Sequence, residues 1–160
     1  IESGTVTLSI EQHRFSELRD YVERTFRQVA DNKELPFDIK LAAELPAAMQ
    51  TDGKRLQQIL KNLLSNAFKY TFEGSIAVSL ESDGSSAILR VRDTGVGIAP
   101  EHIPRLTERF YRVDSGRSRD LGGSGLGLAI VRHALQRHDG VLTIDSIDDH
   151  QVVVLEETKR

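Results

Sequence analysis

The stretch RLQQILKNLLSNAFKY, residues 55–70, determines the kind of fold that this chain can adopt. Its apolar residues recur three and four positions apart, the spacing of one face of an α-helix. Asp52 stands just before the stretch and can accept hydrogen bonds from the first N–H groups of the helix. Because the apolar stripe is wide, the helix must pack against a sheet or another helix. The stripe comprises Leu56, Ile59, Leu60, Leu63, Leu64 and Ala67.

The segment before this helix contains further regular elements. Residues 6–11 alternate as a short strand, and apolar residues at helical spacing predict a helix over 15–31. The segment LPFDIKLAAELP, residues 35–46, is expected to be extended because two prolines bracket it. A short strand is expected near Met49.

The segment after the helix predicts a sheet with two more helices. The expected elements are strands over 75–81, 86–93, 142–146 and 151–155, and helices over 100–108 and 126–138. A turn with the sequence SDGS separates the first two strands, which indicates an antiparallel pair. The sum is an α+β fold, a two-layer sandwich in which a mixed, mostly antiparallel sheet is covered on one face by about three helices.

Composition limits the class of protein. A chain of 160 residues with 39% hydrophobic and 28% charged residues can bury one core, and we expect a single domain over residues 1–160. The net charge of -3 gives no electrostatic reason to expect nucleic acid as a partner. The chain has no cysteine, and its apolar runs are far shorter than the roughly 20 residues that span a bilayer. We therefore expect no disulfide and no membrane insertion of this segment.

A polar stripe runs beside the leucines of the central helix. Asn62 and Asn66 lie four residues apart and so share a helix face, and Lys69 and Tyr70 follow one turn later. Amide oxygens are suitable ligands for Mg²⁺, and a lysine can hold phosphate. On this pattern alone the stripe could equally be a solvated face, although asparagine is a poor helix former.

Asp93 ends the strand predicted over 86–93 and shares a face with apolar residues of that strand. A carboxylate at the end of an apolar row is costly unless a group donates hydrogen bonds to it. The amino group of adenine is such a donor, and Gly95 and Gly97 would let the backbone approach a flat ring. A plain aspartate in a glycine turn is the alternative.

A glycine-rich turn opens the last predicted helix, in the stretch GGSGLGLAIVRHAL, residues 122–135. The first turn of a helix offers N–H groups and a positive dipole end to an anion. The stretch fits neither the Walker loop nor the dinucleotide-binding pattern. The preceding segment has the composition of a mobile lid, with a glycine-rich surface loop as the alternative. Its arginines are Arg109, Arg112, Arg117 and Arg119.

In this order and spacing, the stretches resemble the N, G1, F and G2 boxes of histidine kinases, within the ATPase superfamily that includes gyrase, Hsp90 and MutL. The F box resemblance lies in ERFYRVD, residues 108–114. The stretches IPRLTERFYRVD and GGSGLGLAIVRHAL are similar to phosphate-regulon sensor kinases, and RLQQILKNLLSNAFKYT is similar to hybrid sensor kinases. The resemblance implies a catalytic domain that binds ATP and Mg²⁺.

The resemblance also implies roles for single residues. Asn62 and Asn66 would bind Mg²⁺ and phosphate oxygens, and Lys69 would hold phosphate. Asp93 would accept from the adenine amino group. Arg112 would stabilise charge during phosphoryl transfer, alongside Asn66 and Lys69 as catalytic residues. The remaining nucleotide contacts would come from Tyr70, Gly95, Gly97, Ile98, Tyr111, Gly123, Ser124, Gly125, Leu126 and Gly127.

Two departures from related families bear on the activity. Gyrase-like hydrolases carry a water-activating glutamate four residues before the key asparagine, where this chain has Asn62. An amide is no general base at neutral pH, so phosphoryl transfer is favoured over hydrolysis. The family also has Gly-x-Gly-Ser/Thr before the final strand, where this chain has DSIDDHQVVV, residues 145–154. We therefore expect a shortened or altered hairpin there.

The partners follow from what the chain lacks. None of its five histidines has the sequence context of a phosphoacceptor. We expect the acceptor histidine on a separate dimerisation domain, with residues 1–5 as the end of the linker from it, and a response regulator downstream. A cytoplasmic location is expected, and the resemblance leaves open whether the parent protein is anchored in the inner membrane. A regulatory module without phosphotransfer and a hydrolase of the gyrase and Hsp90 type are the alternatives.

Overall fold

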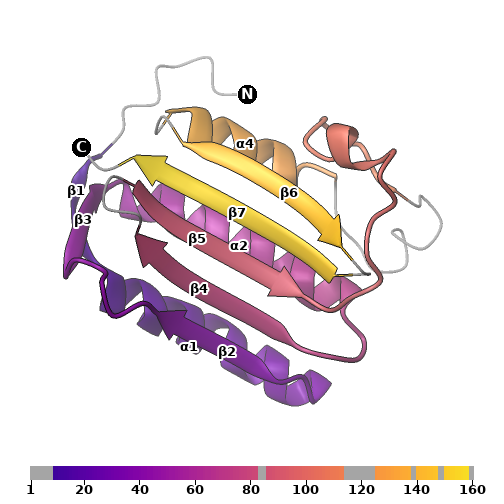
Figure 1. Ribbon diagram of the computed structural model, residues 1–160, viewed down its shortest axis with the longest axis horizontal. Helices are drawn as coiled ribbons and strands as arrows, with labels where there is room; N and C mark the ends of the chain where they lie inside the picture. The colour runs from indigo at the N-terminus through magenta and orange to yellow at the C-terminus, as the bar shows by residue number, and fades with distance from the viewer. Residues whose placement is uncertain (1–8, 83–85, 114–124, 138–139, 148–149, 159–160) are drawn as a thin grey trace.

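The computed structural model describes residues 9–82, 86–113, 125–137, 140–147 and 150–158 of the chain. Five strands form one sheet, and three helices cover one of its faces (Figure 1). The strands in spatial order are β2 (Phe37–Leu41), β4 (Ile76–Ser82), β5 (Ser86–Asp93), β7 (His150–Thr158) and β6 (Val141–Ile147). The helices are α1 (Phe15–Lys33), α2 (Gly53–Tyr70) and α4 (Gly127–Arg137). The predicted α+β sandwich is confirmed.

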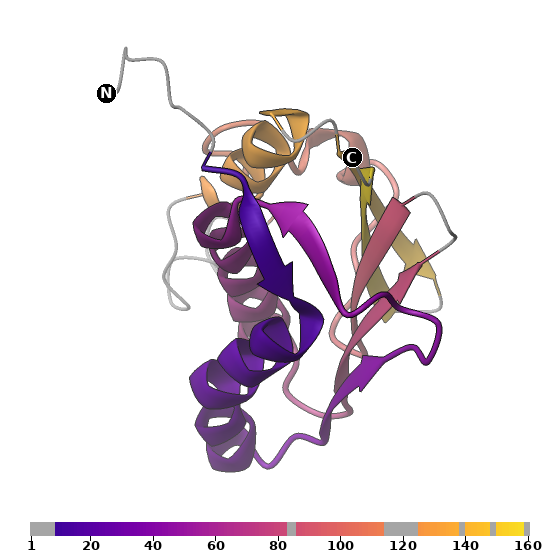
Figure 2. The same cartoon turned by 90° about the vertical axis from the view of Figure 1, so that its left-hand side faces the viewer.

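The sheet is mixed, as predicted. β2 pairs with β4 in parallel, and the other neighbouring strands pair antiparallel. The two layers are plain in Figure 2, where the helices lie on one side of the sheet. Strands β1 (Glu11–Arg14) and β3 (Ala48–Thr51) form a separate two-stranded ribbon at one end of the sandwich.

Helix α2 has the core role that its leucines predict. Leu60 and Leu64 are 0% exposed, and the rest of the apolar stripe is buried as well. Asp52 caps the helix, since its Oδ1 accepts a hydrogen bond from Arg55 N at 3.2 Å. Its Oδ2 accepts from Ser9 N at 3.1 Å. The cap therefore also ties the incoming chain to the start of α2.

The predicted parity of β5 is confirmed. Ala87, Leu89, Val91 and Asp93 are all buried, whereas Arg92 on the opposite face is exposed. A strand alternates its side chains between two faces, so the row that packs under the helices continues to the carboxylate of Asp93.

Two local predictions are wrong. The strand predicted over 6–11 has residues 6–8 outside the described residues, and of residues 9–11 only Glu11 belongs to a strand, β1 at Glu11–Arg14. Before Glu11 the incoming chain bonds to a side chain instead of continuing the ladder, since Ser9 N donates to Asp52 Oδ2 at 3.1 Å.

The helix predicted over 100–108 is only a 3₁₀ turn, η1 (Ile103–Arg105), flanked by further turns. Pro104 lacks the N–H that an α-helix would bond to the carbonyl of Pro100. The segment instead uses bonds to the third preceding residue, such as His102 N to Ala99 O at 3.0 Å.

The C-terminal hairpin consists of β6 and β7. β6 and β7 pair from Val141 opposite Glu156 to Ile147 opposite His150. The expectation of a hairpin shortened or altered relative to the family stays a prediction. The turn at residues 148–149 lies outside the described residues. No helix in the described ranges is long and apolar enough to cross a membrane.

Replacing Leu64 by alanine should lower the free energy of unfolding by about 2 to 5 kcal/mol, because the side chain is fully buried and its removal leaves a cavity. Urea unfolding followed by circular dichroism measures the change. Gln57→Ala, at an exposed position of the same helix, should stay within about 0.5 kcal/mol of the wild type. Equal effects of the two substitutions would contradict the core role of α2.

Candidate active site

Apart from Tyr111 and Arg112, which follow η1, the described site residues that the sequence predicts come together at one end of the sandwich. They lie on the C-terminal half of α2, in the turn after β5 and at the start of α4, which meet at the right-hand end of Figure 1. The β1–β3 ribbon occupies the opposite end. Gly123 and Ser124 lie outside the described residues.

The asparagine stripe of α2 faces the first turn of α4. Asn62 Nδ2 donates to Gly127 O at 3.4 Å, across 65 residues of sequence. A Cβ placed on Gly127 would lie 3.9 Å from Asn66 Nδ2 and 3.9 Å from Asn62 Cβ. Both asparagines are half-buried, so the stripe is not a freely solvated helix face. The amide groups and the positive end of the α4 dipole therefore face the same place.

Gly125 fixes the approach to α4. Its φ is +75°, and a Cβ on it would lie 2.9 Å from the backbone of Phe110, so a side chain has no room. Phe110 N donates to Gly125 O at 2.9 Å, and Phe110 itself has a φ of +66°. This backbone contact holds together the two ends of the segment that the sequence predicts to be a lid.

The turn after β5 is held against the end of α2. Asp93 is 3% exposed, and its Oδ1 accepts from Gly95 N at 2.9 Å. Val96 N donates to Tyr70 O at 3.3 Å. A Cβ on Gly95 would lie 2.5 Å from the same carbonyl oxygen, so this glycine is required by the protein's own backbone. Gly97 adopts a φ of +71°, which favours glycine.

Lys69 lies in the last turn of α2 and is half-buried, as is Tyr70. Asn66 and Lys69 are three residues apart, so they lie one turn apart on one side of the helix. The order along α2 is thus two amides followed by a cation, running from Gly127 of α4 toward the turn after β5.

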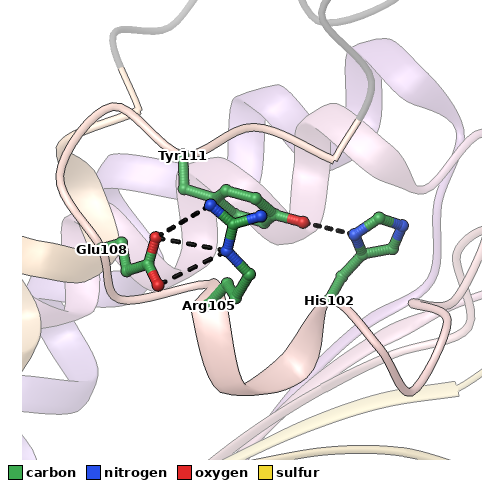
Figure 3. Close-up of polar contacts among 4 residues, drawn as sticks. All are labelled: His102, Arg105, Glu108 and Tyr111. Atoms are coloured by element: carbon green, nitrogen blue, oxygen red, sulfur yellow. Dashed lines mark hydrogen bonds and ion pairs between the residues drawn. The ribbon is translucent and has the colours of Figure 1, made fainter.

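Tyr111 contacts the side chains of His102 and Arg105 in the preceding turn, and Glu108 in turn binds Arg105 (Figure 3). Its hydroxyl shares a hydrogen bond with His102 Nδ1, and the Arg105 guanidinium lies 4.3 Å from the centre of its ring. Glu108 binds Arg105 at 3.2 Å and raises the pKa of that guanidinium. Arg112 follows directly and is half-buried. The predicted nucleotide contacts of Tyr111 and Arg112 remain predictions.

Residues 51–157 match the family described as histidine kinase-, DNA gyrase B-, and HSP90-like ATPase. The chain belongs to this family. The domain is similar to the phosphate regulon sensor protein PhoR of Pseudomonas aeruginosa, with 48% identity over 111 residues, 68% of this chain and 25% of the relative. It is similar to the sensor histidine kinase RcsC of Escherichia coli, with 38% identity over 141 residues, 87% of this chain and 15% of the relative.

Solved structures agree with this assignment. Full-length ShkA in complex with AMPPNP has a TM-score of 0.84 at 27% identity, covering 98% of this chain and 33% of that one. The mycobacterial sensor histidine kinase MprB has a TM-score of 0.76 at 28% identity, covering 94% and 98%. The chain is therefore a histidine kinase catalytic domain and spans 15–25% of the length of the two curated relatives.

Two residues of this kinase domain lie at the site but were not predicted from the sequence. Ser146 Oγ on β6 accepts a hydrogen bond from Ile98 N at 2.9 Å. Thr71, just after α2, is 0% exposed, and its Oγ1 has no hydrogen-bond partner within the described part of the chain. Both Thr71 Oγ1 and Asp93 Oδ1 lie within 3.0 Å of the position that a Cβ on Gly95 would take. No local pattern signals either contact, because each depends on chain segments that meet only in the fold.

Replacing Thr71 by valine should raise the free energy of unfolding of the nucleotide-free domain by about 1 kcal/mol. The two side chains have the same shape, and the change removes a buried hydroxyl that has no partner. Thr71→Ser keeps the hydroxyl and removes a buried methyl group, so it should lower stability. Urea unfolding distinguishes the two. A Thr71→Val variant less stable than the wild type would show that the hydroxyl is hydrogen-bonded in the folded domain.

Proposed function

We propose that this domain binds ATP with Mg²⁺ between α2, the turn after β5 and the first turn of α4, and transfers the γ-phosphoryl group to a histidine on a separate phosphoacceptor domain. The observation that carries the proposal is the meeting of Asn62 and Asn66 with Gly127 at the start of α4. It places amide oxygens, a helix N-terminus and a nearby lysine at one end of the fold.

This end suits a triphosphate and its metal ion. Mg²⁺ takes few protein ligands and keeps waters and phosphate oxygens, so two amide oxygens on α2 can serve it. The first turn of α4 favours negative charge, and Lys69 adds a cation one turn beyond Asn66. The similar protein ShkA was solved with AMPPNP, a nucleotide of the ATP type, which supports this choice of ligand.

The adenine base of the nucleotide would lie at Asp93. Its carboxylate is buried at the end of β5, where an amino group in the plane of a ring can donate to it. The turn through Gly95 and Gly97 borders this position, with Ile98 as its last residue. Tyr70 lies at the end of α2, within reach of the same turn.

Transfer rather than hydrolysis follows from the residue types. The amide of Asn62 does not activate water at neutral pH, so the γ-phosphoryl group waits for another nucleophile. Arg112 would offset the charge that develops on the phosphoryl oxygens. The acceptor would be a histidine on a dimerisation domain of the parent protein, with a response regulator as the next acceptor. Both partners and the catalytic domain would act in the cytoplasm.

Replacing Asp93 by asparagine should weaken ATP binding about tenfold to a hundredfold. The change removes a charge-assisted hydrogen bond to the base, worth roughly 1.5 to 3 kcal/mol. Calorimetric titration with Mg-ATP measures the dissociation constant. Asp38→Asn, at an exposed position on β2, is the matched control and should bind as the wild type does. An unchanged affinity of the Asp93 variant would place the base elsewhere.

Asn66→Ala should lower the rate of phosphoryl transfer by about a hundredfold or more, because a ligand of the metal and phosphates is lost. The assay mixes the domain with a histidine phosphoacceptor domain of a related sensor kinase and labelled Mg-ATP. Wild-type binding of ATP without any transfer would instead favour a regulatory module. Steady phosphate release that survives Asn66→Ala would indicate a hydrolase and contradict the role given to Asn66.

A further inference from the structure

The turn that follows β5 is fastened to the sheet by a single side chain from a distant strand. Ile98 N donates a hydrogen bond to Ser146 Oγ at 2.9 Å, and the two residues are 48 positions apart in sequence. Ser146 lies near the end of β6, an edge strand that pairs only with β7 in the described sheet. The contact thus joins the edge of the sheet to the turn that begins at Asp93.

The first half of this turn is held in a different way. Thr94 N donates to Ser75 O at 3.1 Å, and Val96 N donates to Tyr70 O at 3.3 Å. These bonds are made by backbone carbonyls of α2 and of the residue before β4, so no substitution removes them directly. They end at Val96. Beyond it, Gly97 takes a φ of +71° directly before Ile98.

Gly97 makes the second half of the turn depend on Ser146. Glycine has more accessible backbone conformations than any other residue, so a turn through Gly97 keeps its shape only if its far side is fixed. In the described chain, the hydroxyl of Ser146 accepts the amide of Ile98 at that far side. The turn is therefore held from α2 on one side and from β6 on the other.

We propose that Ser146 is a positioning residue for the nucleotide base, acting through the Gly97–Ile98 backbone. The inference rests on the proposed function, in which this turn borders the base beside Asp93. By holding the amide of Ile98, Ser146 keeps the far wall of that site at the spacing a purine ring requires. The support comes from Ser146 of β6, which lies within residues 145–154, the segment where the chain departs from the Gly-x-Gly-Ser/Thr pattern.

A positioning role and a purely structural role of Ser146 predict different effects when its hydroxyl is removed. Ser146 is half-buried, so water can replace its hydroxyl at the amide of Ile98 when the side chain is shortened. If Ser146 positions the base, the folded domain should lose little stability, while the turn samples more conformations and binds the base less well. The distinguishing quantity is thus nucleotide affinity compared with the stability of the nucleotide-free domain.

The experiment compares the wild type with Ser146→Ala, Ser146→Thr and Thr143→Ala. Thr143 is an exposed hydroxyl residue of the same strand and serves as the matched control. Calorimetry with Mg-ATP gives the dissociation constants, thermal unfolding without nucleotide gives stability, and hydrogen exchange followed by NMR reports on the amide of Ile98.

Ser146→Ala should bind ATP about three- to tenfold more weakly, the range of one lost hydrogen bond, and its Ile98 amide should exchange faster. Its unfolding midpoint should match that of Thr143→Ala. Ser146→Thr keeps the hydroxyl and should restore both the affinity and the slow exchange.

Wild-type ATP affinity in Ser146→Ala would overturn the inference and leave the proposed function intact. A loss of affinity that Ser146→Thr does not restore would also overturn it, because the hydroxyl would not be the cause. Failure of the wild-type domain to bind ATP at all would instead overturn the proposed function itself, and is recognised by the absence of heat in the first titration.

Discussion

The burial of the leucine stripe of α2 is the constraint on which the rest of the structure depends. The helix lies between α1 and α4 and under the sheet, so its orientation about its own axis is fixed by the residues that must avoid water (Figure 1). Once Leu60 and Leu64 point into the core, Asn62 and Asn66 must face sideways toward α4. The chemistry of the site is therefore set by the packing of the core, since a rotation of α2 would expose leucine and bury amide groups together.

Glycine occupies the positions near the site for more than one physical reason. Gly95 and Gly125 are excluded from carrying a side chain by the protein's own backbone, at Tyr70 and Phe110 respectively. Gly127 has more space, and its nearest neighbours are the asparagines of α2. A glycine-rich sequence thus combines positions that close the fold with a position that leaves room beside polar groups. Only the structure separates the two kinds, because the sequence pattern is the same for both.

Local patterns in the sequence predicted what depends on neighbouring residues. The α2 stripe, the cap at Asp52 and the inward direction of Asp93 all follow from spacing along the chain, and the structure has each of them. Pro104 shows the limit within a local segment, because its missing N–H outweighs a helical pattern. Other features depend on segments that meet only after folding. They are the parallel pairing of β2 with β4, the separate β1–β3 ribbon and the bond from Ile98 to Ser146. No periodicity encodes those meetings.

The two hydrogen bonds of Asp52 join the beginning of α2 to the chain that precedes it. One carboxylate oxygen holds the helix start at Arg55 and the other holds the incoming chain at Ser9. The helix has 18 residues and is thus a stiff rod about 27 Å long, with this fastening at one end and the amide groups and lysine toward the other. The carboxylate of Asp52 thus anchors the end of α2 that lies farthest from Asn66 and Lys69 to the incoming chain.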